Sequence, residues 1–111
     1  MPKQTRAGYR LIFNTCPNLK VARSIATLLV RERLAACANV MPMAQSIYRW
    51  QGKVESAREV LLLIKVRAAD YKRVERRIKA LHPYELPEII SVGIADGYAR
   101  YLAWLGNPDK S

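Results

Sequence analysis

Apolar residues recur along the chain with two different periods, and the change from one to the other predicts its elements. Residues 9–15 are rich in large apolar side chains, which is typical of a strand. Apolar residues then recur at the helical spacing i, i+3, i+4 and i+7, at Ala22, Ile25, Ala26 and Leu29. The pattern therefore predicts a strand and then an amphipathic helix over residues 19–33, with Asn18 as the N-cap of that helix.

Two apolar segments separated by a turn predict a long hairpin in the middle of the chain. Residues 35–48 are apolar without a helical period and indicate a strand, in which Pro42 predicts a bulge or a change of pairing. Residues 51–53, Gln-Gly-Lys, predict the turn, and the returning strand extends to Arg67.

The returning strand also predicts that the protein assembles with other subunits. One face of the strand is wholly apolar and predicts the core: Val60, Leu62, Ile64 and Val66. The other face places two leucines among charged residues: Glu59, Leu61, Leu63, Lys65 and Arg67. That face is too apolar for water and too charged for a core, so we expect another subunit to cover it.

The remaining elements complete a familiar order. Asp70 is expected to cap a helix that runs through Leu81, residues 88–94 form a further strand, a last helix opens at residues 96–97, and residues 107–111 form a tail. The order favours an α+β fold: a ferredoxin-like βαββαβ sandwich with an antiparallel sheet, a long hairpin and a C-terminal helix. We expect one domain over residues 1–111, with an ordered core at about residues 9–105.

The net charge of +10 and the pI near 10.1 raise the question of a polyanionic partner. The basic residues are scattered, and the densest run, Lys72 to Lys79, lies on a predicted helix whose other side is apolar. No nucleic-acid-binding motif accompanies them. We therefore interpret the run as a solvated helix face, with non-specific attraction to polyanions and no specific nucleic-acid partner.

Nothing in the sequence indicates export or membrane insertion. No apolar run approaches the length of a bilayer span, and the polar, basic N-terminus does not resemble a signal peptide. With only two cysteines, Cys16 and Cys37, free thiols and a cytoplasmic location are expected.

Residues 82–89, His-Pro-Tyr-Glu-Leu-Pro-Glu-Ile, are the most unusual segment because they contain the only histidine among two prolines and two glutamates. Each proline fixes its own φ and restricts the residue before it, which predicts a stiffly extended loop with His82 at the end of the preceding helix. The segment is either a prepared binding site or an ordinary connector. The imidazole ring itself is not expected to hold the loop in place.

This segment is similar to a motif of the CutA divalent-cation tolerance proteins. Three other segments resemble that family in the same order: residues 34–39 (Leu-Ala-Ala-Cys-Ala-Asn), 46–55 (Ser-Ile-Tyr-Arg-Trp-Gln-Gly-Lys-Val-Glu) and 101–105 (Tyr-Leu-Ala-Trp-Leu). The resemblance extends from about Arg10 to Leu105. It implies a ferredoxin-like homotrimer in which long hairpins pack sheet edges between subunits, and a role in tolerance of divalent metal ions, with copper the usual ion.

The resemblance also suggests metal ligands. Copper binding in the family is associated with a Cys at the end of the first strand and a His-His pair, whose positions are Asn14, Leu81 and His82 here, so only His82 matches. Cys16 lies two residues beyond the position of the family's Cys. No metal-binding spacing is present locally. We therefore predict weak binding of Cu(II) or another divalent cation through His82, with Cys16 as a further candidate, and no metal requirement for folding.

A second set of residues matches polar and aromatic positions of the family and is called the polar cluster below: Tyr48, Trp50, Glu59, Lys65, Tyr84, Glu85 and Glu88. Tyr84 and Glu88 are the expected partners of Lys65. The cluster either fixes the geometry of a trimer or binds a small anionic metabolite at subunit seams, as in the related nitrogen-regulatory proteins. No catalytic triad or phosphate-binding loop occurs, so we do not expect an enzyme, although His82 beside Glu85 leaves general-base chemistry as a weaker alternative.

Overall fold

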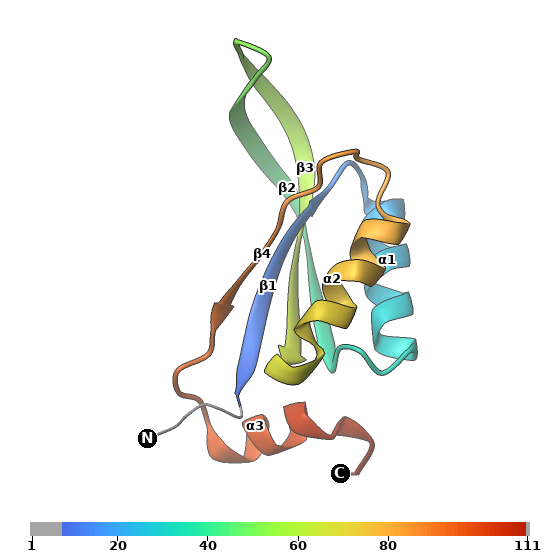
Figure 1. Cartoon of the computed structure of the whole chain (residues 1–111), viewed down its shortest axis with the longest axis vertical. Helices are drawn as coiled ribbons and strands as arrows, with labels where there is room; N and C mark the ends of the chain where they lie inside the picture. The colour runs from blue at the N-terminus through green and yellow to red at the C-terminus, as the bar shows by residue number, and fades with distance from the viewer. Residues whose placement is uncertain (1–7, 111) are drawn as a thin grey trace.

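The computed structural model describes residues 8–110 and contains the predicted order of elements (Figure 1). The strands and helices are β1 (Tyr9–Cys16), α1 (Leu19–Arg31), β2 (Cys37–Trp50), β3 (Lys53–Arg67), α2 (Tyr71–Leu81), β4 (Ile89–Gly93) and α3 (Ala99–Gly106), with 3₁₀ turns at Ala68–Asp70 and Pro108–Lys110. Within the described residues, no helix is both long and apolar enough to cross a bilayer.

The strands form one antiparallel sheet in the order β2-β3-β1-β4, which is the order of a ferredoxin-like sandwich. Figure 1 shows α1 and α2 on one face of this sheet and α3 at the end where the chain enters β1. The predicted core face of β3 packs under the two helices and is almost fully buried: Val60, Leu62, Ile64 and Val66. The predicted α+β fold is therefore confirmed.

Helix α1 begins as predicted, because Asn18 Oδ1 accepts a hydrogen bond from the Val21 backbone N–H at 2.9 Å. It ends at Arg31, earlier than the predicted residue 33. The reason is local: Arg33 has φ 63°, in the left-handed region that a right-handed helix does not contain.

Asp70 precedes α2 at the predicted position, but its carboxylate does not cap the helix. The carboxylate instead accepts hydrogen bonds from Arg67 Nε, at 2.8 Å, and from the guanidinium of Arg73. Asp70 is 2% exposed, so these two cations compensate the charge of a buried carboxylate. The predicted N-cap is wrong, because charged partners compete better for the carboxylate than a backbone N–H does.

Strands β2 and β3 form a hairpin whose far end projects beyond the rest of the molecule (Figure 1). Gln51 and Gly52 both have positive φ, 50° and 80°, which gives a tight turn that matches the twist of the strands. The pairing register shifts after Met41, next to Pro42, and Met43 has φ 70°. The predicted bulge is confirmed, and it follows from the missing N–H of proline.

The sheet face opposite α1 and α2 carries apolar side chains that the helices do not cover. These residues alternate with core residues along their strands: Leu11 and Phe13 in β1, Leu61 and Leu63 in β3, and Ile90 and Val92 in β4. Phe13 lies in register with Leu63 and Ile90, and Leu11 lies in register with Val92. Ile90 is 56% exposed and Val92 49%. The apolar character of this open face, which the sequence of β3 predicted, therefore extends over three strands.

The loop after α2 differs from the sequence-based prediction. His82 is extended, with φ −79° and ψ 136°, and ends α2 as expected. Residues 83–86 then bend, so the prediction of a stiffly extended segment is wrong there. Proline fixes φ but leaves ψ free, and the loop uses that freedom to turn back toward β3.

Candidate functional site

A groove of about 700 Å³, here called the hairpin groove, lies between the projecting hairpin and the loop after α2. Its walls include most of the polar cluster: Tyr48, Trp50, Glu59, Tyr84, Glu85 and Glu88. The fold thus brings together residues from β2, β3 and the loop, which lie far apart in the sequence. Lys65, the remaining member of the cluster, does not line the groove.

The rim of the hairpin groove is unusually apolar for a surface. Ile47 of β2 is 70% exposed and Leu86 of the loop 72%. Arg49 is the basic residue of the lining, against three carboxylates. Ile47, Arg49 and Leu86 were not predicted from the sequence to line a site, although their positions beside Tyr48 and Glu85 could have indicated them.

Glu59 and Tyr84 join the two walls of the groove. The Tyr84 hydroxyl donates to Glu59 Oε2 at 2.7 Å, and Glu59 is 8% exposed. Burial, together with this hydrogen bond and the charge of Glu59, raises the pKa of Tyr84 far above its ordinary value. The phenol therefore remains a neutral donor at physiological pH, with Glu59 Oε2 as its acceptor.

His82 lies behind the groove with both ring nitrogens in hydrogen bonds. Nε2 lies 2.8 Å from the carbonyl oxygen of Thr15, and Nδ1 accepts from the Tyr84 backbone N–H at 3.1 Å. Because a carbonyl oxygen only accepts, Nε2 carries the proton, and both nitrogens of the neutral ring are engaged in hydrogen bonds. The ring also contacts that of Tyr84, with centroids 4.8 Å apart. The expectation that the ring does not hold the loop is wrong: it connects α2, β1 and the loop.

Cys16 is fully buried at the end of β1. Its Sγ donates to Asn14 Oδ1 at 3.4 Å, and Asn14 Nδ2 donates to the Glu88 carbonyl at 2.8 Å. Burial, followed by the charge of Glu59, raises the pKa of the Cys16 thiol to about 11. The thiol is therefore protonated at neutral pH, while Asn14, where the family resemblance places a Cys, ties β1 to the segment before β4.

Lys65 has a different partner from the one expected. Its Nζ donates to the Tyr101 hydroxyl of α3 at 3.2 Å and lies 5.5 Å from the centroid of that ring. The hydrogen bond with Tyr101 is the main reason that the pKa of Lys65 is raised. The predicted pairing of Lys65 with Tyr84 and Glu88 is wrong, because these two residues lie at the hairpin end while Lys65 faces α3.

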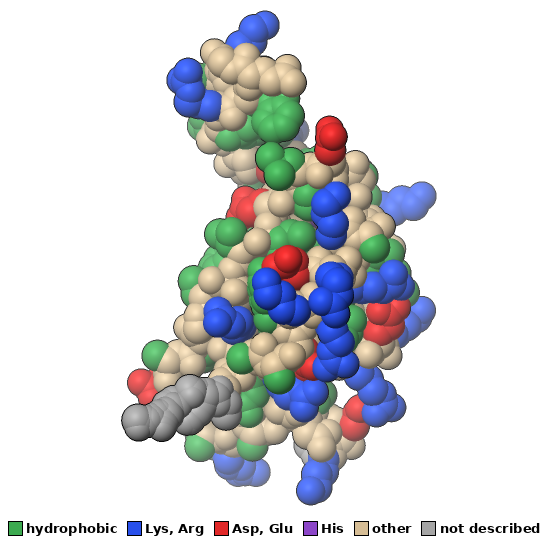
Figure 2. Space-filling view, in the orientation of Figure 1, with side chains coloured by type: hydrophobic (Ala, Val, Ile, Leu, Met, Phe, Trp, Pro, Cys, Tyr) green, Lys and Arg blue, Asp and Glu red, His purple; other side chains and the backbone are tan. Residues whose placement is uncertain are grey.

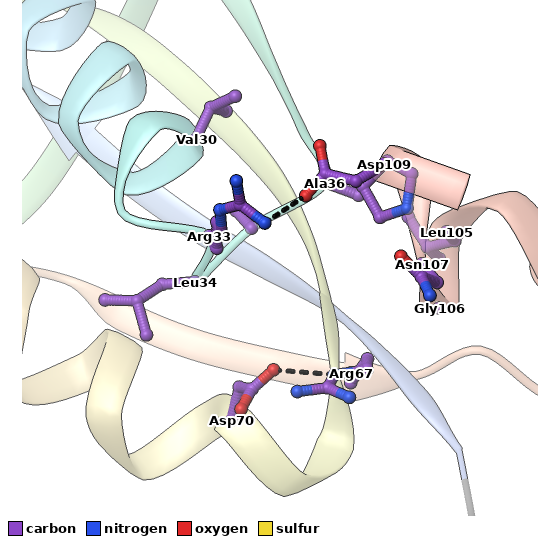
Figure 3. A pocket seen from close by; sticks show the side chains of 12 residues that line it. Val30, Arg33, Leu34, Ala36, Arg67, Asp70, Leu105, Gly106, Asn107 and Asp109 are labelled. Carbon is purple, nitrogen blue, oxygen red and sulfur yellow. Dashed lines mark hydrogen bonds and ion pairs between the residues drawn. The ribbon is translucent and has the colours of Figure 1, made fainter. Parts of the chain in front are cut away.

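A second, smaller pocket of about 350 Å³ lies between the loop after α1, the end of β3 and the C-terminal segment (Figure 3). Two guanidiniums reach it, and each is paired: Arg33 with Asp109 and Arg67 with Asp70, both at 2.8 Å. The charges within this pocket are therefore largely balanced. The ion pair of Asp109 also shows that part of the predicted C-terminal tail is fixed to the body.

The hairpin groove contains acceptors for a cation, but a single chain does not gather enough of them. Among residues 8–110, no group of three or more His, Cys, Asp or Glu side chains is close enough to hold a metal ion. Glu85 and Glu88 are exposed at the groove, whereas Glu59, His82 and Cys16 already have partners. A divalent cation bound here would need further donors from outside the chain.

We expect the Cys16 thiol to be inert in the native protein at pH 8, because only the thiolate is nucleophilic and its pKa is about 11. Since the folded-state pKa lies above the ordinary thiol value of 9.0, the buried thiol stabilises the fold below pH 9. This stabilisation, about 3 kcal/mol in all, is lost as the pH rises from about 9 to about 11. Alkylation followed by mass spectrometry, and urea unfolding over this pH range, measure the two effects.

Cys16→Ala is the control, since it should flatten the alkaline part of the stability curve. Cys37→Ser should leave that part unchanged, because Cys37 lies on β2 away from Glu59. Rapid alkylation of native Cys16 at pH 8 would contradict the expectation.

Comparisons with known proteins identify relatives over most of the chain. The family model described as "CutA1 divalent ion tolerance protein" matches residues 10–108. The chain is 50% identical over 95 residues to the "Divalent-cation tolerance protein CutA" of Thermus thermophilus, which covers 86% of this chain and 92% of that protein. It is 43% identical over 99 residues to the human "Protein CutA", covering 89% of this chain but only 55% of the human protein.

A solved structure agrees with the fold as well. The "Periplasmic divalent cation tolerance protein CutA" from Archaeoglobus fulgidus matches with a TM-score of 0.85 at 35% identity, covering 87% of this chain and 94% of that one. Sequence and structure therefore resemble the same group of proteins over nearly the full length of the chain.

Proposed function

The chain belongs to the CutA1 divalent ion tolerance family, and from this premise we propose that it acts as a homotrimer whose subunit seams bind divalent cations weakly. The observation that supports the assembly is the open apolar face of the sheet. A partner subunit that covers this face would remove the exposed parts of Ile90 and Val92 from water. The number of subunits, three, comes from the family resemblance.

We expect the β2–β3 hairpin to contact the neighbouring subunit. It projects from the body with exposed apolar side chains near its tip, among them Ile47, Trp50 and Val54. β2 and β4 are the edges of the sheet and offer unpaired backbone groups to a neighbour. A hairpin that packs head-to-tail on the next subunit makes a heterologous contact, which can close into a ring.

We place the divalent cation at the hairpin groove, where a neighbouring subunit supplies the donors that one chain lacks. Glu85 and Glu88 are the groove carboxylates that are exposed and available. His82 and Cys16, the ligands predicted from sequence, would each have to give up a hydrogen bond before they could bind a metal. Carboxylate ligands discriminate poorly among divalent ions. A preference of this site for Cu(II) would therefore reflect only the general order of metal affinities.

Calorimetric titration of the tag-free protein with Cu(II) and Zn(II) measures this site. We expect Glu85→Gln/Glu88→Gln to weaken Cu(II) binding at least tenfold, about 1.4 kcal/mol, because the remaining donors do not complete a coordination sphere. The matched control, Glu55→Gln/Asp96→Asn, removes the same charge outside the groove and should bind as the wild type does. Equal weakening in both variants would contradict a groove site, while the sedimentation behaviour of each variant reports separately on the trimer.

The alternative of an anionic metabolite finds less support in the groove, because three carboxylates face one guanidinium there. We propose no catalytic role, since both nitrogens of the His82 ring are engaged in hydrogen bonds. We also propose a single domain and a cytoplasmic location, the latter because both cysteines are free thiols.

A further inference from the structure

The outward faces of α1 and α2 together form one basic surface, here called the basic helix surface. On α2, Lys72, Arg76 and Lys79 follow the spacing i, i+4 and i+7 and are all exposed. They point away from Val74 and Ile78, which are fully buried. The three cations therefore form a stripe along the solvent side of the helix.

Helix α1 contributes a second stripe beside the first. Lys20, Arg23 and Arg31 are exposed on α1, with Lys20 and Arg31 opposite its buried residues and Arg23 on a flank. The two helices are joined where Arg77 of α2 donates two hydrogen bonds to the Glu32 carboxylate, at 2.8 and 2.7 Å. Figure 2 shows Lys and Arg side chains gathered over this helix layer.

The cations of this surface outnumber the carboxylates near them. Among residues 8–110, none of the six cations of the two stripes forms an ion pair. Three carboxylates lie nearby. Glu32 pairs with Arg77, Asp70 pairs with Arg67 and Arg73, and Glu75 of α2, beside Lys72 and Lys79, hydrogen-bonds Tyr71. The sequence alone suggests that the basic run on α2 is a solvated face. The packing of α1 beside α2 adds the cations of a second helix to it.

We propose that the basic helix surface binds the phosphate backbone of nucleic acid without reading its sequence. The stripe from Lys72 to Lys79 extends about 10 Å along a rigid helix, which equals the rise of roughly three phosphates of one strand along the DNA axis, at about 3.4 Å each. No aromatic side chain other than the partly buried Tyr71 lies on these helices, so base stacking contributes nothing. The interaction is therefore electrostatic and independent of sequence.

The same surface fits an anionic membrane less well. Insertion into a lipid headgroup layer needs exposed apolar side chains beside the cations. The exposed large apolar residues lie on the hairpin, β4, the loop and the start of α3, and Val30 is the one that lies on α1 or α2 among the described residues. The basic helix surface also lies on the opposite side of the sheet from the open apolar face, so assembly through that face leaves it free.

The experiment is fluorescence anisotropy of the full chain with a labelled 25-base-pair duplex of mixed sequence, titrated at several salt concentrations. We expect binding in the micromolar range at low salt that weakens steeply as salt rises. Lys72→Gln/Arg76→Gln/Lys79→Gln should lower the affinity at least tenfold. It should also reduce the slope of log K against log[salt] by about 2 to 3, since each lost phosphate contact removes about 0.9.

The control is Lys53→Gln/Arg100→Gln/Lys110→Gln, which removes the same charge from exposed positions outside α1 and α2. This variant should retain most of the affinity and the slope, and a duplex of different sequence should bind equally. Equal losses in the two triple variants would overturn the proposal, because net charge alone would then explain binding. Tighter binding to phosphatidylserine vesicles than to DNA would overturn it as well. Unchanged melting temperatures confirm that both variants are folded.

Discussion

We expect Leu63→Asp to dissociate the proposed homotrimer into monomers at concentrations where the wild type is assembled. Leu63 lies at the centre of the open sheet face, in register with Phe13 of β1, which in turn lies in register with Ile90 of β4. A carboxylate at this position would be buried without a partner in every subunit. Such a charge costs about 3–5 kcal/mol, which corresponds to a loss of about two to four orders of magnitude in the association constant.

Sedimentation velocity over a range of concentrations measures this effect. Ser24→Asp is the matched control, because Ser24 is exposed on the outer side of α1 and adds the same charge away from the open face. We expect the control to sediment as the wild type does. Reversible melting of the wild type should also shift to lower temperature on dilution, since folding and assembly are linked. A wild-type monomer at micromolar concentration would remove the basis of the prediction.

The elements of the fold could be predicted because local chemistry decides them. Asn18 caps α1 through its own side chain, Gly52 permits the hairpin turn, and Pro42 cannot donate to the sheet. The two-faced character of β3 was also visible, since alternate residues of a strand must point to opposite faces. What the sequence could not show was that β1 and β4 continue the apolar face, because this depends on which strands become neighbours.

The partners of the site residues were predicted less well, because they depend on where distant elements meet. Lys65 and Glu59 lie on one face of β3, but they face opposite ends of the molecule, and Lys65 meets Tyr101 of α3 there. Asp70 lies at the predicted helix start, but Arg67 and Arg73 donate hydrogen bonds to its carboxylate. In both cases the partner is a charged or polar side chain whose proximity cannot be deduced from spacing in the sequence.

His82 is the clearest case of a residue whose type suggested one role and whose surroundings indicate another. A lone histidine in a proline-rich loop resembles a ligand or a base when it is viewed in sequence. In the structure it is 8% exposed and connects the Thr15 carbonyl to the Tyr84 backbone N–H. Because Tyr84 in turn holds Glu59, the ring supports one wall of the hairpin groove without lining it.

His82→Ala is therefore expected to destabilise the protein in the absence of any metal. The truncation removes the ring from a buried position and leaves the Thr15 carbonyl and the Tyr84 N–H without partners, at about 1–3 kcal/mol for each unsatisfied group. For a chain of this length, a loss of about 3 kcal/mol lowers the melting temperature by more than roughly 10 °C. Thermal melts of metal-free protein at fixed concentration measure the change.

Two comparisons distinguish a structural role of His82 from a role as a metal ligand. Lys79→Ala truncates an exposed side chain in the last turn of α2 and should melt within a degree or two of the wild type, because it breaks no hydrogen bond. His82→Gln retains a side-chain donor that can reach Thr15 and should recover part of the stability. Imidazole ¹⁵N chemical shifts should show the proton on Nε2 at neutral pH, since the Thr15 carbonyl can only accept. If His82→Ala melts as the wild type does, yet loses Cu(II) binding, the ring is a metal ligand and the groove carboxylates are secondary.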